Sequence, residues 1–266
     1  MTERRDGSVA PGRVTLVGGG PGSRDLLTLG AVEALRQADV VLYDRLAPIE
    51  VLYEFCPDAV HIDVGKLPGH HAVPQHEIER LLVEHALAGA RVVRLKGGDP
   101  YIFGRGGEEV LACRRAGVPV EVIPGVTSAV AVPAASGIPL THRGISHAFT
   151  VISGHAPLTA SEFTHLAGLG GTIVVLMGVS ALPALAPGLV AAGLAADTPA
   201  AVIERGHRSG QRTTFAPLGE LPVAAARAAV RSPAVIVIGE VVRLAAEGDV
   251  AADAVLRRAG EDAIAP

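Results

Sequence analysis

Two charged dipeptides follow predicted strands in the first third of the chain. Asp44-Arg45 ends the apolar run Val40–Tyr43, and Gly65-Lys66 ends the run Val60–Val64. A carboxylate and an ammonium at neighbouring strand ends can serve as a general acid and base. They can equally form a structural ion pair, and the residue types alone do not separate these two interpretations.

A glycine-rich segment begins at Lys96 and carries the next candidate residues. Gly97 and Gly98 would allow a ligand to approach the backbone closely just before Asp99. The carboxylate of Asp99 can accept a hydrogen bond from a ribose hydroxyl or an amine. No Gly-Lys-Ser/Thr ending is present, so this segment is not a phosphate-binding P-loop. We therefore favour a functional role for Asp99.

The same segment continues through Arg105 into a predicted helix. Gly106-Gly107 precede the helix start, where Glu108 and Glu109 would suit the positive end of the helix dipole. We favour a functional role for Arg105 and interpret Glu109 as a capping acid.

The glycine run Gly18–Gly22 follows the first predicted strand and is similar to a dinucleotide-binding loop. The third glycine position of that motif holds Ser23, and Pro21 removes a backbone N–H that a pyrophosphate would require. The loop therefore argues against nicotinamide or flavin binding and favours another nucleoside-like ligand.

Histidine and methionine positions add little on their own. His70, His71 and His76 lack acidic partners at ligand spacing, so no metal site is expected. His155 follows a predicted strand and Gly154, which suggests a polar contact to a ligand. Met177 ends an apolar strand, and the residues alone favour core packing there.

The elements that position these residues alternate between strands and helices. This order predicts an α/β protein with a parallel sheet in its first half, where ligands bind beyond the carboxyl ends of the strands. The second half opens at Pro124, and the segment 200–217 could form an antiparallel hairpin. We predict domains at 13–123 and 124–245, the second with a mixed sheet, and terminal tails at 1–12 and 246–266. Predicted strands are 13–17, 40–43, 60–64, 91–95, 118–123, 149–152, 172–177, 200–203, 213–216 and 234–238.

Composition excludes several classes of protein. The 266 residues are 49% hydrophobic with a net charge of -4, which is unlike a nucleic-acid binder or a basic membrane-surface protein. Of 23 Lys and Arg residues, only Lys66 and Lys96 are lysines, so these positions are expected to need a compact ammonium. Two widely spaced cysteines and a polar N-terminus predict a cytoplasmic protein. The uncharged stretch 167–196 is broken by Gly and Pro and is interpreted as strand, turn and helix.

Taken in order, these motifs resemble the uroporphyrinogen-III C-methyltransferases, which use S-adenosylmethionine. The resemblance runs from about Val14 to Val242. Two positions depart from the family pattern, Gly19 for alanine and Leu176 for an aromatic residue. The segments that match the family are Val17–Gly22, Leu26–Leu29, Ala38–Leu46, Val64–Lys66, Pro74–Ile78, Val92–Glu109, Pro124–Ser128, Gly137–Arg143 and Ser153–His155.

The resemblance implies a role for each matching position. Asp44 matches the proposed proton acceptor and Lys66 the proposed donor, and with Arg105 they are the three candidate catalytic residues. Which of the three takes the departing proton stays open. Cofactor contacts would come from Pro21, Gly97, Gly98, Asp99, Ile102, Thr127, Ser128, Met177 and Gly206. Substrate contacts would come from Arg45, Arg105, Glu108, Arg143 and His155.

The family also implies two α/β domains of the tetrapyrrole methylase fold, with the active site in the cleft between them, and a homodimer. The implied reaction methylates uroporphyrinogen III at carbons 2 and 7, through precorrin-1 to precorrin-2, for sirohaem, cobalamin or haem d1. No dehydrogenase–chelatase segment is present, so methyl transfer alone is expected. Three alternatives remain: a nicotinamide-dependent oxidoreductase, a corrin-ring methyltransferase attacking another position, and a non-catalytic tetrapyrrole-binding protein.

Overall fold

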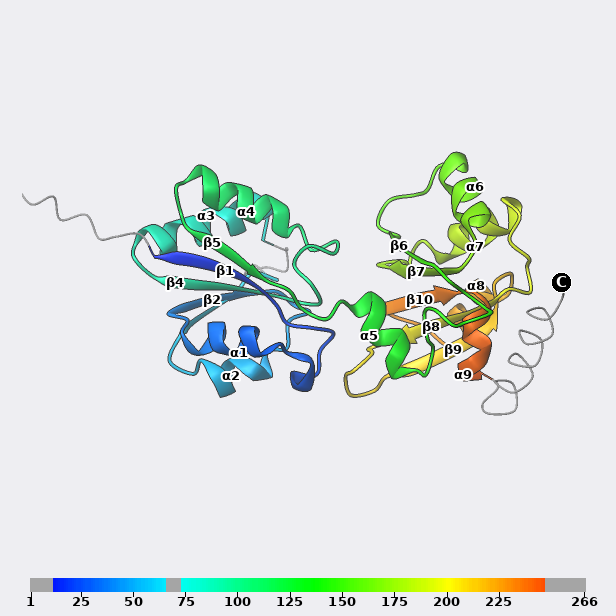
Figure 1. Cartoon of the computed structure of the whole chain (residues 1–266), viewed down its shortest axis with the longest axis horizontal. Coiled ribbons are helices and arrows are strands. Elements are labelled where there is room, and N and C mark those ends of the chain that lie inside the picture. The colour runs from blue at the N-terminus through cyan, green and yellow to red at the C-terminus, as the bar shows by residue number, and fades with distance from the viewer. Residues whose placement is uncertain (1–11, 66–72, 247–266) are drawn as a thin grey trace, which may run out of the picture. The chain divides into compact units, whose positions relative to one another are not determined.

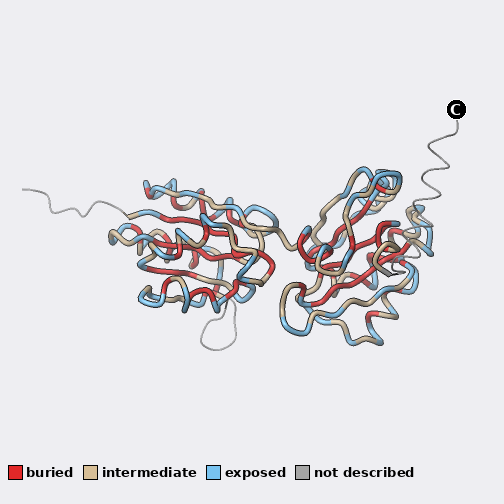
Figure 2. The backbone as a smooth tube through the Cα atoms, turned by 60° about the horizontal axis from the view of Figure 1, so that its bottom comes forward, coloured by how far each residue is buried: buried red, intermediate tan, exposed pale blue. Residues whose placement is uncertain are grey.

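The structure is a computed structural model that describes residues 12–65 and 73–246. The chain divides into two compact units between Thr127 and Ser128. Each unit contains a five-stranded sheet with helices against both faces, and the central strands of each sheet are buried (Figures 1 and 2).

The first unit has an entirely parallel sheet with strand order β3-β2-β4-β1-β5. Parallel strands covered on both faces need nearly continuous apolar sequence. Every residue of β1 and β4 after the first is buried. The strands are β1 (Arg13–Gly18), β2 (Val40–Tyr43), β3 (Val60–Asp63), β4 (Arg91–Lys96) and β5 (Val120–Ile123).

Helices cover the two faces of this sheet in pairs (Figure 1). On one face, α3 (Gln75–Leu87) and α4 (Gly106–Arg115) pack on alternate strand residues such as Leu16 and Leu42. On the other face, α1 (Leu29–Arg36) and α2 (Glu50–Phe55) pack on Val17, Val41 and Leu95. The 3-10 turn η1 (Arg24–Leu26) precedes α1.

The second unit has a mixed sheet with strand order β6-β7-β10-β8-β9. The pair β6 and β7 is parallel, whereas β10 runs antiparallel to both β7 and β8. Strands β8 and β9 form the antiparallel hairpin that we considered for 200–217. The strands are β6 (Phe149–Ser153), β7 (Thr172–Leu176), β8 (Pro199–Glu204), β9 (Arg212–Pro217) and β10 (Ala234–Ile238).

Helices again lie on both faces. One face packs against α6 (Ala160–Leu169), α7 (Leu182–Ala191) and α8 (Leu221–Arg227). The other packs against α5 (Ser128–Ala135), the 3-10 turn η2 (Glu240–Val242) and α9 (Arg243–Ala246).

The uncharged stretch 167–196 forms the end of α6, the strand β7 and the helix α7, as predicted. Among the described residues, no helix is both long and apolar enough to span a membrane. The short helix α2 has no counterpart in the predicted elements. In the first unit, α3 buries Ile78, Leu82 and Ala86 against the sheet.

Candidate active site

The carboxyl ends of β1, β2 and β4 lie side by side, since Gly18 pairs with Lys96 and Tyr43 with Leu95. The loops after β1 and β4 are joined by two backbone hydrogen bonds. Gly98 N–H donates to the Gly20 carbonyl at 2.7 Å, and Gly20 N–H donates to the Gly98 carbonyl at 3.1 Å. The predicted ligand loops therefore form one continuous surface at this sheet edge.

Packing within the chain explains several of the glycines in these loops. A methyl group on Gly18 would lie 2.4 Å from the Gly125 nitrogen, and one on Gly97 would lie 2.7 Å from Leu46 Cβ. Gly98 has a φ of 68°, a conformation that favours glycine. The absence of a side chain at Gly18 and Gly97 is thus explained by close packing within the chain, without a dinucleotide.

Asp44 follows β2 and is held by three donors. Its Oδ1 accepts from the backbone N–H of Leu46 at 3.2 Å and of Gly97 at 3.4 Å. Its Oδ2 accepts from the Arg94 guanidinium at 3.4 Å. The Asp44 side chain remains 29% exposed, so its carboxylate is fixed yet open to solvent. Lys66, its predicted partner, lies outside the described residues.

A buried charge cluster lies behind Asp44, and the sequence predictions missed it. Glu109 in α4 is completely buried, and its carboxylate accepts from Lys96 Nζ at 3.0 Å and from Arg94 Nε at 3.1 Å. Interpreting Glu109 as a capping acid was therefore wrong. Burial and the charge of Arg94 lower the pKa of Lys96, while Glu109 opposes this change. The signal in the sequence was two cations on one face of a strand expected to be buried.

Asp99 follows β4 and ties its loop to the segment after β5. Its Oδ1 accepts from the Tyr101 N–H at 2.8 Å, and its Oδ2 accepts from the Gly125 N–H at 3.0 Å. Next to it, Ile102 and Phe103 expose apolar side chains, and Phe103 has a left-handed φ of 52°. The loop is thus tightly anchored while it presents apolar groups to solvent.

Arg105 is the residue before α4 and also has a left-handed φ, of 58°. Its guanidinium binds the Glu108 carboxylate through two hydrogen bonds of 2.8 and 2.7 Å, and both side chains are exposed. The Glu108 hydrogen bonds raise the pKa of Arg105, and the Arg105 hydrogen bonds lower the pKa of Glu108. Another planar anion could compete for this exposed fork.

The second unit presents further predicted residues at one edge of its sheet. The carboxyl ends of β6, β7 and β8 share this edge. Ser153 pairs with Leu176, and β7 and β8 have the same direction because both are antiparallel to β10. His155, Met177 and Gly206 follow these three strands. Met177 is 47% exposed and has a φ of 56°, so it is not the core residue that the residue types alone favoured.

Gly206 is buried between Arg205 and His207, both of which have left-handed φ values. A methyl group on Gly206 would lie 2.5 Å from Val132 Cγ1 in α5. The imidazole of His207 also lies against α5, with Nε2 at 2.8 Å from the Ala131 carbonyl. This turn is therefore packed onto the helix that begins at Ser128.

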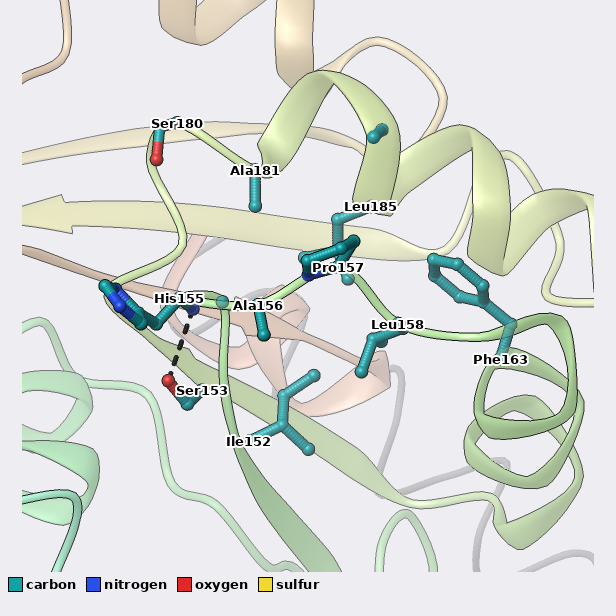
Figure 3. A pocket seen from close by; sticks show the side chains of 12 residues that line it. Ile152, Ser153, His155, Ala156, Pro157, Leu158, Phe163, Ser180, Ala181 and Leu185 are labelled. Carbon is teal, nitrogen blue, oxygen red and sulfur yellow. Dashed lines mark hydrogen bonds between the residues drawn. The ribbon is translucent and has the colours of Figure 1, made fainter.

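A pocket of about 300 Å³ lies beside His155 in the second unit (Figure 3). Its lining is mostly apolar and includes Ile152, Leu158 and Phe163. Figure 3 shows the His155 ring at the opposite end of this lining from Phe163. His155 therefore borders an apolar wall.

The remaining predicted residues differ in their exposure. Arg45 and Arg143 are exposed, and Pro21 is buried. Thr127 and Ser128 lie at the division between the units. In the described part of the chain, no three His, Cys, Asp or Glu side chains gather as metal ligands, and His70 and His71 lie outside it.

Both sheets carry their glycine-rich and polar residues beyond strand carboxyl ends, the arrangement of α/β enzymes that bind small ligands. A model of the tetrapyrrole (corrin/porphyrin) methylases matches residues 13–222. The chain belongs to the tetrapyrrole methylase family. This agrees with the resemblance seen in the sequence and with the predicted α/β fold.

Individual relatives support the same family. The siroheme synthase of Tolumonas auensis is 49% identical over 89% of this chain, but the chain spans about half the length of that relative, 50%. The S-adenosyl-L-methionine-dependent uroporphyrinogen III methyltransferase of Methanosarcina barkeri is 47% identical over 88% of this chain and 93% of its own. The uroporphyrin-III C-methyltransferase of Thermus thermophilus, solved with S-adenosylhomocysteine, is 44% identical with a TM-score of 0.74, over 88% of this chain and 100% of that one.

Proposed function

We propose that the protein transfers methyl groups from S-adenosylmethionine to carbons 2 and 7 of uroporphyrinogen III, giving precorrin-2 through precorrin-1. One observation carries the proposal from the geometry. The N–H of Gly97, in the predicted cofactor loop, donates to Asp44, the predicted proton acceptor, at 3.4 Å. A methyl donor at this loop would thus have a carboxylate base beside it. Two relatives that match over nearly their whole length are named as a uroporphyrinogen III methyltransferase and a uroporphyrin-III C-methyltransferase, which supports methyl transfer to this class of substrate.

The residues present suit an adenosyl sulfonium. Asp99 uses one acceptor site on each carboxylate oxygen for a loop N–H, and a carboxylate has about four such sites. A ribose hydroxyl or an amine can therefore join them. Ile102 and Met177 expose apolar side chains that suit contact with the adenosyl group. We propose cofactor contacts from Pro21, Gly97, Gly98, Asp99, Ile102, Thr127, Ser128, Met177 and Gly206.

The substrate carries eight carboxylates, and guanidinium groups bind carboxylates through paired hydrogen bonds. Arg45, Arg105 and Arg143 are all exposed and can supply such contacts. We propose that a substrate carboxylate competes with Glu108 for the Arg105 fork. His155 adds a polar contact beside its apolar wall.

Each methyl transfer forms a carbon–carbon bond as the methyl–sulfur bond breaks, and the sulfur keeps the electron pair. S-adenosylhomocysteine leaves, and the methylated ring is cationic until it loses a proton to a base. We assign that base to Asp44, because three hydrogen-bond donors fix the orientation of its carboxylate and the side chain is partly exposed to solvent. Lys66 and Arg105 stay the other candidate catalytic groups. Orientation of the two reactants supplies much of the remaining rate.

The test is anaerobic incubation with uroporphyrinogen III and S-adenosylmethionine, followed by product mass and absorption. We expect two added methyl groups and two S-adenosylhomocysteine molecules per substrate. Turnover only with a later corrin intermediate would assign the protein to another branch of the family. Tetrapyrrole binding without turnover would assign it a non-catalytic role.

We also propose that the protein is a homodimer, as the family resemblance implies. Its composition and net charge of -4 support the further proposal that it is cytoplasmic and binds neither nucleic acid nor membrane. Light scattering should give twice the chain mass. A monomeric mass at micromolar concentration would refute the dimer.

A further inference from the structure

Four charged side chains form a connected group at the end of β2 and β4. Two are cations, Arg94 and Lys96, and two are carboxylates, Glu109 and Asp44. Arg94, Lys96 and Glu109 are at least 96% buried at their side chains, whereas Asp44 is partly exposed. Glu109 balances one of the two buried cations, so the second positive charge is balanced by Asp44.

Arg94 links the buried members to Asp44. Its Nε donates to Glu109 at 3.1 Å, and its Nη1 donates to the carbonyls of Leu95 at 3.0 Å and Leu42 at 3.4 Å. These contacts lock the guanidinium plane and leave Nη2 directed at Asp44 Oδ2. Lys96 donates to both oxygens of Glu109. The hydrogen-bonded ion pairs therefore form a chain, in which Lys96 binds Glu109, Glu109 binds Arg94, and Arg94 binds Asp44.

Stability alone is a weak reason for such a group. Burying ions costs several kcal/mol each, and well-packed apolar residues often replace a buried ion pair without loss. A cluster that ends on a solvent-accessible carboxylate has a second use, since it prevents that carboxylate from rotating. Backbone N–H groups hold only Oδ1, so without Arg94 the Oδ2 atom would have no described donor.

We propose that Arg94 is a positioning residue, which holds the Asp44 carboxylate at the angle needed to accept the proton released after methyl transfer. Glu109 accepts a hydrogen bond from Arg94 directly, whereas the hydrogen bonds of Lys96 go to Glu109. This inference rests on the proposed function, and specifically on the assignment of Asp44 as the base.

The experiment is a double-mutant cycle with Arg94→Met and Asp44→Asn. It uses the full chain and single-turnover transfer of labelled methyl to uroporphyrinogen III. We expect Asp44→Asn to slow turnover by about 10²-fold or more, as loss of a general base does. Arg94→Met should slow it by about 10²-fold through misplacement of that base. Because Arg94 acts through Asp44, Arg94→Met should cause little further loss in the Asp44→Asn background.

Lys96→Met is the matched control, because it removes a cation from the same buried group but not the donor to Asp44. We expect Lys96→Met to lower the melting temperature as much as Arg94→Met does, with a much smaller loss of kcat. S-adenosylhomocysteine affinity should be retained in both variants. If Arg94→Met does not fold, Arg94→Lys replaces it in the cycle, since it keeps the charge while losing the planar fork.

The outcomes separate the two levels of the proposal. No methyl transfer by the wild-type protein would overturn the proposed function. Normal turnover by Asp44→Asn would leave methyl transfer standing and overturn both the base and its positioning. An impaired Asp44→Asn with fully additive losses would overturn the role of Arg94 alone, as would equal kcat losses in Arg94→Met and Lys96→Met.

Discussion

Lys96 Nζ lies 3.0 Å from each carboxylate oxygen of Glu109, and neither side chain is accessible to solvent beyond 4%. Removing one partner of a buried ion pair leaves an uncompensated charge. We expect Glu109→Gln to destabilise the first unit by about 3–5 kcal/mol, measured by urea unfolding. Glu108→Gln is the control, since its ion pair is exposed, and should unfold close to the wild-type midpoint. Equal midpoints for the two variants would contradict this prediction.

Gly206 is required for packing as well as for any contact to a ligand. Since its added methyl would lie 2.5 Å from Val132 Cγ1, Gly206→Ala should cost about 1–3 kcal/mol of stability through overpacking. Adding Val132→Ala should restore part of the lost melting temperature by opening that space. If the double variant is simply the sum of two losses, the predicted clash is absent.

Arg105→Ala should lower turnover by about 10²-fold while S-adenosylhomocysteine binds normally, because a charged hydrogen-bonding group to the substrate is lost. Isothermal titration and steady-state kinetics measure the two effects. Arg115→Ala, which removes an exposed guanidinium at the other end of α4, is the control for net charge. Unchanged turnover in Arg105→Ala would remove Arg105 from the candidate catalytic residues.

Asp99→Ala should act first on the cofactor. We expect S-adenosylhomocysteine affinity to fall by roughly 10- to 100-fold, the value of one or two hydrogen bonds to a charged group. Asp99 also anchors the N–H groups of Tyr101 and Gly125, so the melting temperature must be measured in parallel. Wild-type affinity with reduced stability would make Asp99 purely a loop anchor.

Asp39 makes stability depend on pH in a defined direction. Its carboxylate accepts three hydrogen bonds from Arg91, and these lower its pKa from 3.8 to about 2. Because the folded-state pKa lies below the unfolded value, the ion pair stabilises the fold above about pH 3.8 and is lost as the pH falls through about 2. The melting-temperature difference from Asp39→Asn should therefore be small but constant near pH 6 and disappear toward pH 2. A difference that grows at low pH would have the wrong sign.

Much of the fold follows from local sequence. The strands of the first unit are predictable because a parallel sheet buried on both faces requires mostly apolar residues. In Val92–Leu95, for example, every residue except Arg94 is apolar. The helix α2 is harder to predict, because Glu50–Phe55 is short and has no side-chain cap. Its helical state depends on burial of Val51 and Leu52 against the sheet.

The residues at strand ends were also predictable, since chemistry in parallel α/β sheets gathers beyond the carboxyl ends. The sequence thereby predicts that Asp44, Asp99 and Arg105 lie in loops that follow strands. The partners of Asp44 and Asp99 were not predictable, because they are distant in the sequence. Asp44 meets a guanidinium 50 residues away, and Asp99 meets a backbone N–H 26 residues away.

By itself, then, the sequence determined the family, the α/β class and the order of the loops that carry candidate site residues, because these depend on local patterns. Only the tertiary structure decided what each of those residues touches. Sheet register places Arg94 beside Asp44, and packing of α4 brings Glu109 onto Arg94 and Lys96, the two buried cations of β4. Such contacts depend on strand order and helix packing, which sum small energies over the whole unit. The two cations of the buried strand indicated that a carboxylate must lie nearby, but not which carboxylate it is.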